Sequence, residues 1–135
     1  MGESPKVRGL NHITLAVRDL DRAVAFYRDI LGLDLRKQWS GGAYLEAGAF
    51  WICLSTDPET RSEPHADYTH IAFDVDDEAI EALADRLGKA GAPVWKDNRS
   101  EGASHYFLDP DGHKLEIHAG TLATRMASMD ACCSA

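Results

Sequence analysis

The stretch HITLAV at residues 12–17 recurs as HIAFDV at residues 70–75. Both stretches alternate apolar residues with other residues, as a half-buried strand does. Self-similarity within a chain indicates a repeated structural unit, so the sequence predicts two related modules. The strand that opens each module begins with a histidine, His12 in the first module and His70 in the second.

Each of these strands leads into a predicted helix that begins at an aspartate. Asp19 is a good N-cap for the first helix, and Asp76 or Asp77 for the second. Gly32 and Gly91 follow as C-terminal caps. Between cap and glycine, apolar residues recur at helical spacing and give each helix one apolar face. The first face comprises Ala23, Phe26, Tyr27, Ile30 and Leu31, and the second comprises Ile80, Leu83, Ala84 and Leu87.

Three short strand-like runs follow each helix, so each module has the order βαβββ. They are predicted at 33–39, 43–47 and 50–55, and at 94–97, 105–108 and 114–118. We therefore predict an α+β fold in a single domain. The expected boundaries are modules at 8–56 and 67–120, a polar linker at 57–66, and a tail at 121–135 that is helical at first and then frayed. A module this small leaves a sheet edge uncovered, so the modules must pair, either within one chain or between two.

The composition is that of an acidic globular domain. The chain has 135 residues, of which 44% are hydrophobic and 27% charged, and its net charge is −8. This charge argues against nucleic acid and anionic membranes as partners, while a local cationic pocket still suits a small anionic substrate. Residues 1–6 lack the apolar stretch of a signal peptide. We therefore expect a cytoplasmic protein whose 3 cysteines are reduced.

His12, His70 and Glu116 form a candidate metal-binding set. Two imidazoles and one carboxylate suit a divalent first-row ion with open coordination positions, which acts as a Lewis acid or activates oxygen. A structural zinc site would instead close all of its positions with protein ligands. Each histidine alone is also explained as a polar cap at a strand start. The matched placement in both modules favours the metal.

Other polar and aromatic residues are candidates for ligand binding that also have structural interpretations. The loop at 95–104 contains two cations, several hydroxyl and amide groups, and Gly102, which suits an anion, a monovalent cation or only solvent. Thr14 shares the strand face of His12. Cys53 is read as a small buried apolar residue. For the aromatic residues, core packing competes with ligand contact; they are Tyr44, Trp51, Tyr68 and Tyr106.

Three motifs resemble those of the manganese-dependent fosfomycin-resistance glutathione transferases, in the vicinal-oxygen-chelate superfamily. They are LNHITLAV at 10–17, YTH at 68–70 and YFLDPDGHKLE at 106–116. The resemblance covers roughly residues 9–126, and its most specific part is NRSEG at 98–102 together with Arg125. It implies βαβββ modules paired across a swapped homodimer, and an enzyme that adds the thiol of glutathione to the epoxide of fosfomycin.

The resemblance also implies roles for single residues. His12 of one chain would bind Mn²⁺ together with His70 and Glu116 of the other. A K⁺ ion would be held by Ser100, Gly102 and Ser104. The phosphonate would be held by Lys96, Tyr106 and Arg125, with Asn98 from the loop at 95–104. Thr14 would lie by the epoxide, and Tyr44 and Trp39 near the thiol. The pocket would be shaped by Trp51, Cys53 and Tyr68.

Other activities on the same fold are alternatives. A hydrolytic relative adds water to the epoxide with an extra glutamate base, near a place where this chain has Gly41 and Gly42. Another relative uses bacillithiol or cysteine as the thiol. Two histidines and a carboxylate also suit an Fe(II) dioxygenase that cleaves catechols. A non-catalytic drug-binding module on this fold would need no metal set.

Overall fold

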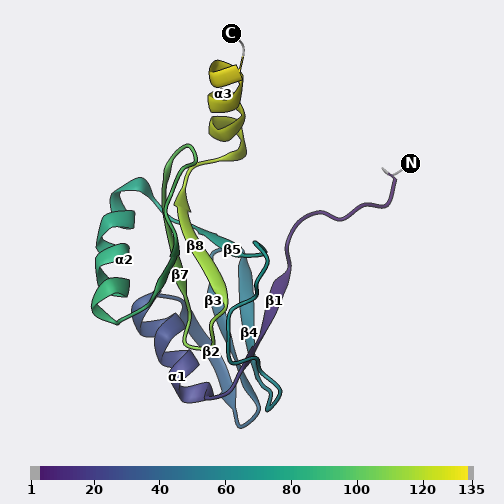
Figure 1. Ribbon diagram of the computed structural model, residues 1–135. Coiled ribbons are helices and arrows are strands. Elements are labelled where there is room, and N and C mark those ends of the chain that lie inside the picture. The colour runs from purple at the N-terminus through teal and green to yellow at the C-terminus, as the bar shows by residue number, and fades with distance from the viewer. Residues whose placement is uncertain (1–3, 134–135) are drawn as a thin grey trace.

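Two four-stranded sheets form the frame of the protein, and the computed structural model describes residues 4–133. The N-terminal sheet has the strand order β1-β4-β3-β2 and the C-terminal sheet the order β5-β8-β7-β6 (Figure 1). In each sheet the first strand pairs parallel with the last, and the other pairings are antiparallel. The strands are β1 (His12–Val17), β2 (Asp34–Trp39), β3 (Gly42–Ala47), β4 (Phe50–Thr56), β5 (Ile71–Asp74), β6 (Val94–Lys96), β7 (Ala103–Leu108) and β8 (Lys114–Ala119).

One helical segment crosses over between the first and second strands of each sheet. These segments are α1 (Leu20–Ala25) continued by η1 (Phe26–Ile30), and α2 (Asp77–Lys89). Both lie on the same side of the sheets (Figure 1), where α1 packs on β3 and β4 and α2 on β7 and β8. The predicted α+β fold with two βαβββ modules is therefore confirmed.

The first helix begins as predicted but widens in its second half. Asp19 accepts a hydrogen bond from the backbone N–H of Arg22 at 3.1 Å, as an N-cap does. From Phe26 onward the turns become π-helical, and the Leu31 N–H bonds to the Phe26 carbonyl at 3.1 Å. Apolar spacing does not distinguish this widened turn from an α-helical one, because Phe26 and Tyr27 are buried in either case.

The core lies between the sheets and these helices, because one face of every central strand is apolar. On the N-terminal sheet this face carries Leu15, Ile52 and Leu45. On the C-terminal sheet it carries Phe107 and Leu115, and both sets join one continuous cluster. The opposite faces carry polar and aromatic residues, so the alternation of each strand separates the core from the candidate site.

A turn at the end of β7 joins the second module to the first. Its Asp109 carboxylate accepts the Tyr27 hydroxyl at 2.6 Å and the backbone N–H groups of Asp111 and His113 at 2.9 Å. The Asp111 carboxylate accepts the Arg18 N–H at 3.0 Å. The DPDG turn that the sequence predicts is thus also a buried contact between modules.

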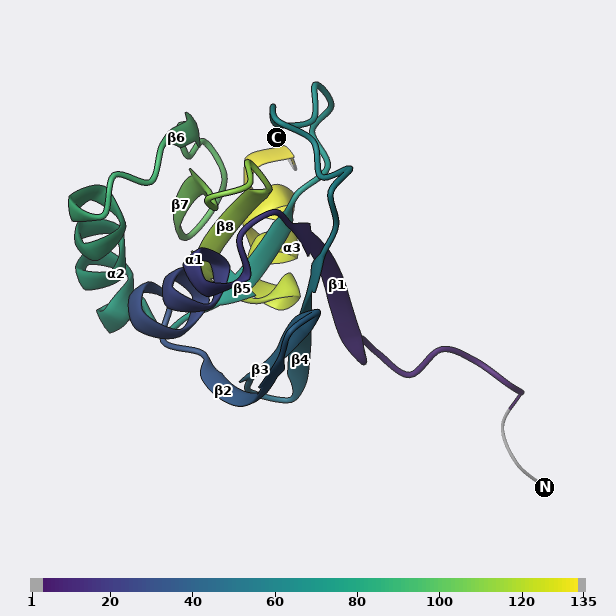
Figure 2. The same ribbon diagram turned by 90° about the horizontal axis from the view of Figure 1, so that it is seen from below.

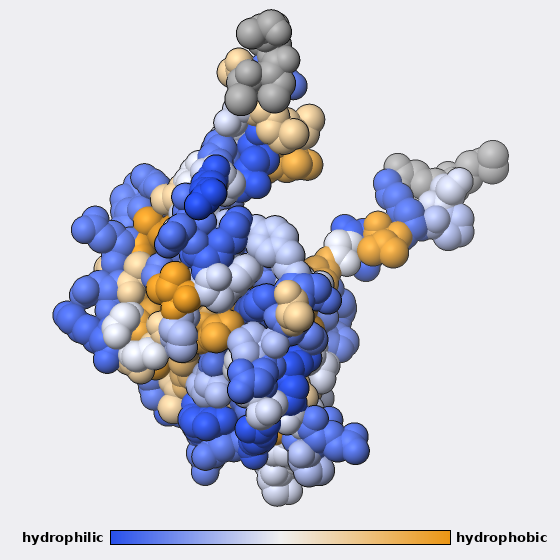
Figure 3. Space-filling view, viewed as in Figure 1, coloured by the Kyte–Doolittle hydropathy of each residue, from blue (hydrophilic) through white to orange (hydrophobic). Residues whose placement is uncertain are grey.

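The third helix, α3 (Leu122–Cys133), projects from the body, as does the segment before β1 (Figure 1). The helical start that was predicted for the tail is confirmed, and the helix continues to Cys133, while residues 134–135, where fraying was expected, lie outside the described part of the chain. Figure 3 shows apolar side chains on this helix above a largely hydrophilic surface, and Leu122, Met126 and Met129 are exposed there. The side chains of Cys132 and Cys133 lie outside the described part of the chain.

Within residues 4–133, no helix is both long enough and apolar enough to cross a membrane.

Candidate functional site

The open face of the N-terminal sheet carries half of the predicted site residues. Register places Thr14 beside Cys53 and Cys53 beside Tyr44, in one row across β1, β4 and β3. His12 is exposed, and its ring stacks on Trp51 with centroids 4.8 Å apart. Trp39 meets Tyr44 edge to face at the far side of the sheet, 4.8 Å between centroids. His12, Thr14 and this aromatic surface therefore share one face of the sheet, whose strands β1, β4 and β3 lie side by side in Figure 2.

His70 and Glu116 meet at the other sheet. The Nε2 atom of His70 lies 2.9 Å from Oε1 of Glu116, and both side chains are largely buried, 19% and 7% exposed. The His70 Nδ1 atom lies 2.9 Å from the Tyr68 carbonyl. A carbonyl only accepts, so Nδ1 must carry the proton. The nitrogen that faces Glu116 is then the one that can act as a ligand, with the other nitrogen bonded to a carbonyl as in most histidine ligands of metals.

Lys96 lies next to this pair with its ammonium between two phenol rings. Its Nζ donates to the Tyr68 hydroxyl at 2.5 Å and sits 4.8 Å from the Tyr68 ring centroid and 4.7 Å from that of Tyr106. The hydrogen bond to Tyr68, more than any other contact, raises the pKa of Lys96. The side chain is therefore cationic at neutral pH and supplies the positive charge that an oxyanion requires.

The loop before β7 is held in shape by its own side chains. Asn98 accepts hydrogen bonds from the N–H and hydroxyl of Ser100 at 3.0 and 2.9 Å, and its amide donates to the Gly102 carbonyl at 2.9 Å. Gly102 has φ of +81°, and a Cβ there would lie 2.9 Å from the Ala119 carbonyl. Glycine is thus required both by the backbone angle and by the close approach of β8.

Arg125 reaches this loop from α3. Its guanidinium lies 3.4 Å from the Glu101 carboxylate, 3.4 Å from the Ser100 hydroxyl and 3.5 Å from Nε2 of His118. The helix therefore places a second cation on the same side of the C-terminal sheet as Lys96. Ser104 completes this region by donating to Oε2 of Glu116 at 2.7 Å.

One chain does not bring the three predicted metal ligands together. Across residues 4–133, no three His, Cys, Asp or Glu side chains converge on a common point. His70 and Glu116 are paired, whereas His12 faces solvent on the other sheet. The candidate site thus exists in a single copy as two separate halves.

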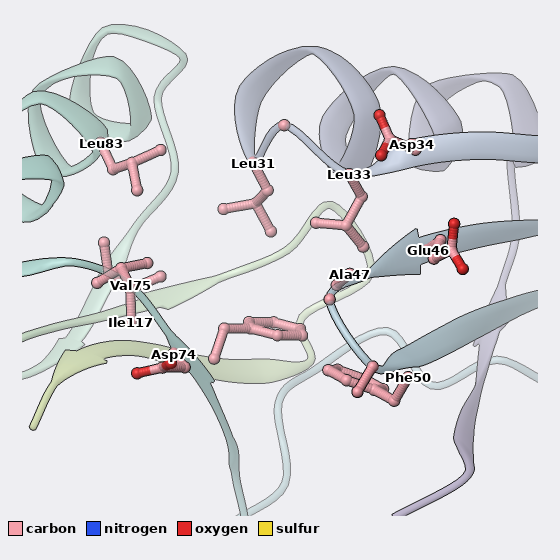
Figure 4. A pocket seen from close by; sticks show the side chains of 14 residues that line it. Leu31, Leu33, Asp34, Glu46, Ala47, Phe50, Asp74, Val75, Leu83 and Ile117 are labelled. Atoms are coloured by element: carbon pink, nitrogen blue, oxygen red, sulfur yellow. The ribbon is translucent and has the colours of Figure 1, made fainter. Parts of the chain in front are cut away.

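A cavity of about 400 Å³ between the modules lies apart from both halves. Figure 4 shows Leu31, Leu33 and Phe50 of the first module facing Val75 and Leu83 of the second. No predicted site residue lines this cavity.

Sequence reasoning gave no role to two residues that the structure places in the site. Trp95 packs edge to face against both His70 and Tyr106, with centroids 5.2 Å away in each case. His118 lies 2.6 Å from the Ser104 hydroxyl. Strand alternation carried the signal for His118, because it lies two residues after Glu116 on β8 and therefore shares its face.

Known proteins with similar sequences identify the family of this chain. Residues 9–117 match the model of the Glyoxalase/Bleomycin resistance protein/Dioxygenase superfamily. The chain is 53% identical to the glutathione transferase FosA of Serratia marcescens, over 90% of this chain and 88% of that protein. It is 40% identical to the metallothiol transferase FosB of Shouchella clausii strain KSM-K16, over 90% and 86% of the two chains.

A solved structure shows the same fold. The fosfomycin resistance protein FosX of Listeria monocytogenes, crystallised with Mn(II) and sulfate, superposes with a TM-score of 0.78 at 31% identity, covering 92% of this chain and 99% of that one. The fold and the sequence identity therefore point to the same family. The chain belongs to the glyoxalase/bleomycin resistance protein/dioxygenase superfamily and, within it, to the fosfomycin-resistance enzymes.

Proposed function

We propose that this protein inactivates fosfomycin by Mn²⁺-dependent addition of the glutathione thiol to the epoxide. The observation that carries the proposal is the His70–Glu116 pair, 2.9 Å apart, with the cationic Lys96 beside it. Fosfomycin combines a dianionic phosphonate with a strained ring, so its turnover requires both an electrophilic centre and positive charge. The 53% identity to a glutathione transferase favours glutathione as the thiol.

The donor atoms of this chain fit a divalent first-row ion. With its proton on Nδ1, His70 directs Nε2 toward Glu116 across 2.9 Å, so the two side chains are close enough to serve as neighbouring ligands of one ion. His12 would complete the set. A bound Mn²⁺ would supply Lewis-acid polarisation of the epoxide C–O bond.

His12 is supplied, in this proposal, by a second copy of the chain. Both β1 and β5 are edge strands of their sheets, and His12 opens β1 while His70 directly precedes β5. Pairing the β1 edge of one copy with the β5 edge of another covers both edges and brings the histidines together. A twofold dimer makes this exchange twice and forms two equivalent sites.

Around the metal, the chain's side chains bind the phosphonate. Lys96, Tyr106 and Arg125 supply the donors for its oxygens, and Thr14 reaches the site from the N-terminal sheet of the other copy. Asn98 holds the loop in which Ser100, Gly102 and Ser104 offer oxygens to K⁺. Two cations and K⁺ offset the substrate charge within a chain whose net charge is −8.

The thiol attacks the ring carbon next to phosphorus, opposite the departing oxygen. A C–S bond forms, the C–O bond breaks, and the released oxygen takes up a proton. Tyr44 and Trp39 line the approach of the thiol, while Trp51, Cys53 and Tyr68 shape the pocket around the drug. The protein contributes no covalent nucleophile, so positioning and charge supply the catalysis.

Phosphorus NMR of fosfomycin tests this function directly. Purified protein with Mn²⁺ and K⁺ is incubated with glutathione, cysteine, bacillithiol or no thiol. We expect the glutathione adduct to form fastest and Glu116→Ala to form none. A diol without thiol would indicate hydrolysis instead, and a cysteine or bacillithiol adduct formed faster would reassign the thiol.

Two other outcomes would reject thiol transfer altogether. Oxygen uptake with a catechol and Fe(II), with fosfomycin unchanged, would indicate a dioxygenase. Stoichiometric binding of fosfomycin without turnover would indicate a drug-binding module. Lys96 and Arg125 count against the dioxygenase, because a catechol needs neither cation.

A further inference from the structure

A continuous run of side chains connects Arg125 to Glu116. The guanidinium of Arg125 lies 3.5 Å from Nε2 of His118, and Nδ1 of His118 lies 2.6 Å from the Ser104 hydroxyl. That hydroxyl lies 2.7 Å from Oε2 of Glu116. The other oxygen of Glu116 faces His70. The run therefore connects Arg125, a proposed phosphonate ligand, to the oxygen of the proposed metal ligand Glu116 that does not face His70.

One direction of donation satisfies every member of the run. Arg125 only donates and the Glu116 carboxylate only accepts. Ser104 has one proton, so when it donates to Glu116 its oxygen must accept from Nδ1–H of His118. Nε2 of the neutral imidazole is then free to accept from Arg125. The reverse direction would leave Oε2 of Glu116 without this donor and point an N–H of His118 at the guanidinium.

Glycines on two sides of the ring confine His118. A Cβ on Gly120 would lie 2.6 Å from His118 Nε2, and a Cβ on Gly102 would lie 2.9 Å from His118 Cε1. The side chain is 16% exposed. The imidazole is thus held in one place by close contacts, with one nitrogen directed to each half of the run.

We propose that His118 is a positioning residue with two separable tasks, and this inference rests on the proposed function for the identity of the ligands. Through Nδ1 it orients the Ser104 hydroxyl toward Glu116 and so sets the affinity for Mn²⁺. Through Nε2 it orients Arg125 and so sets the affinity for an oxyanion. A hydrogen-bonded chain of this kind strengthens each of its links.

Two variants separate these tasks, because each retains the hydrogen bond made by one ring nitrogen and removes the bond made by the other. His118→Asn places an amide N–H near the Nδ1 position and has nothing at Nε2. His118→Gln extends an amide oxygen toward Arg125 and has no group at Nδ1. The probes are Mn²⁺ alone, titrated by electron paramagnetic resonance, and inorganic phosphate, titrated by calorimetry on the Mn²⁺-loaded protein. Neither readout depends on turnover.

We expect His118→Gln to lose Mn²⁺ affinity by about 10- to 100-fold and to keep phosphate affinity within about 2-fold of wild type. His118→Asn should keep its Mn²⁺ affinity and lose phosphate affinity by about 2- to 10-fold. Ser104→Ala should lose Mn²⁺ affinity as His118→Gln does, and all titrations are made without K⁺ because Ser104 is also a proposed K⁺ ligand. His65→Asn, in the exposed segment before β5, is the matched control and should change neither affinity.

Equal losses of both affinities in the Asn and Gln variants would show that the ring only fills space, and unchanged affinities would show that it does nothing here. Either result overturns the inference. Circular dichroism identifies a variant that fails to fold, in which case Ser104→Ala decides. Failure of the proposed function is a separate result. In that case the wild-type protein would leave fosfomycin unchanged, irrespective of the affinities of the variants for Mn²⁺ and phosphate.

Discussion

The histidines at equivalent positions of the repeat have different surroundings. His70 is largely buried and its tautomer is fixed by the Tyr68 carbonyl, whereas His12 is exposed and stacks on Trp51. The surroundings of His12 are those of one half of a site, without the groups of the other half. Strand alternation could predict that both histidines leave the core face, but not which groups they meet, since that depends on contacts between distant parts of the chain or between chains.

Lys96 gives a prediction at the scale of a single residue. Its ammonium is held between Tyr68 and Tyr106, and its raised pKa keeps it charged at neutral pH. Replacing it in Lys96→Met removes a charge-assisted hydrogen bond to the phosphonate. We expect KM for fosfomycin to rise by about 10- to 100-fold while Mn²⁺ affinity stays unchanged, as measured by initial rates and by metal titration.

Lys89→Met is the matched control. Lys89 is an exposed cation on α2, the helix that packs on the core face of the C-terminal sheet, and it pairs with Asp85 at 3.1 Å. Its loss should leave KM unchanged. An equal rise of KM in both variants would show that only the overall charge of the protein matters, and would remove Lys96 from the site.

At the scale of elements, the sequence predicted the strands well and the helices less completely. Alternation of apolar residues located all eight strands to within two residues at each end. The π-helical turn at Phe26–Ile30 was missed because its apolar face matches that of an α-helix. No end was predicted for α3, because the small and polar residues along it give no stop signal.

Tyr27 tests the contact between the modules. It is fully buried, and its hydroxyl donates to Asp109 at 2.6 Å. Tyr27→Phe leaves a buried carboxylate oxygen without this donor, so we expect the free energy of unfolding to fall by about 1–3 kcal/mol. Urea denaturation at fixed protein concentration measures the loss. Tyr44→Phe, at an exposed position of β3, should cost far less, and an equal cost would contradict the assigned role of the buried contact.

The same pair has a defined pH dependence. Burial, and then the charge of Asp109, raise the pKa of Tyr27 well above 10.0. A group whose pKa is higher in the folded state stabilises the fold below its unfolded pKa and loses that contribution as the pH rises beyond it. The stability difference between wild type and Tyr27→Phe should therefore shrink above pH 10. A stability difference that stays constant up to alkaline unfolding would contradict this expectation.

At the scale of the whole molecule, the repeat was sufficient to predict the fold but not the assembly. The repeated strand, the helix caps and the DPDG turn are local signals, and each matched an observed element. The grouping of Lys96, Tyr106, Ser104 and Glu116 followed because they lie on adjacent strands of one sheet. The position of His12 relative to them is not local, and a single copy leaves it apart.

Mixing two inactive variants tests the shared site most directly. His12→Ala and Glu116→Ala are refolded together in equal amounts, and fosfomycin turnover is followed by phosphorus NMR. Each variant alone has no complete site, whereas a mixed dimer has one complete site formed by His12 of one copy with His70 and Glu116 of the other. We predict recovery of about a quarter of wild-type turnover, since about half of the dimers are mixed and half of their sites are complete. If the mixture stays as inactive as its components while refolded wild type is active, the ligands do not come from two copies.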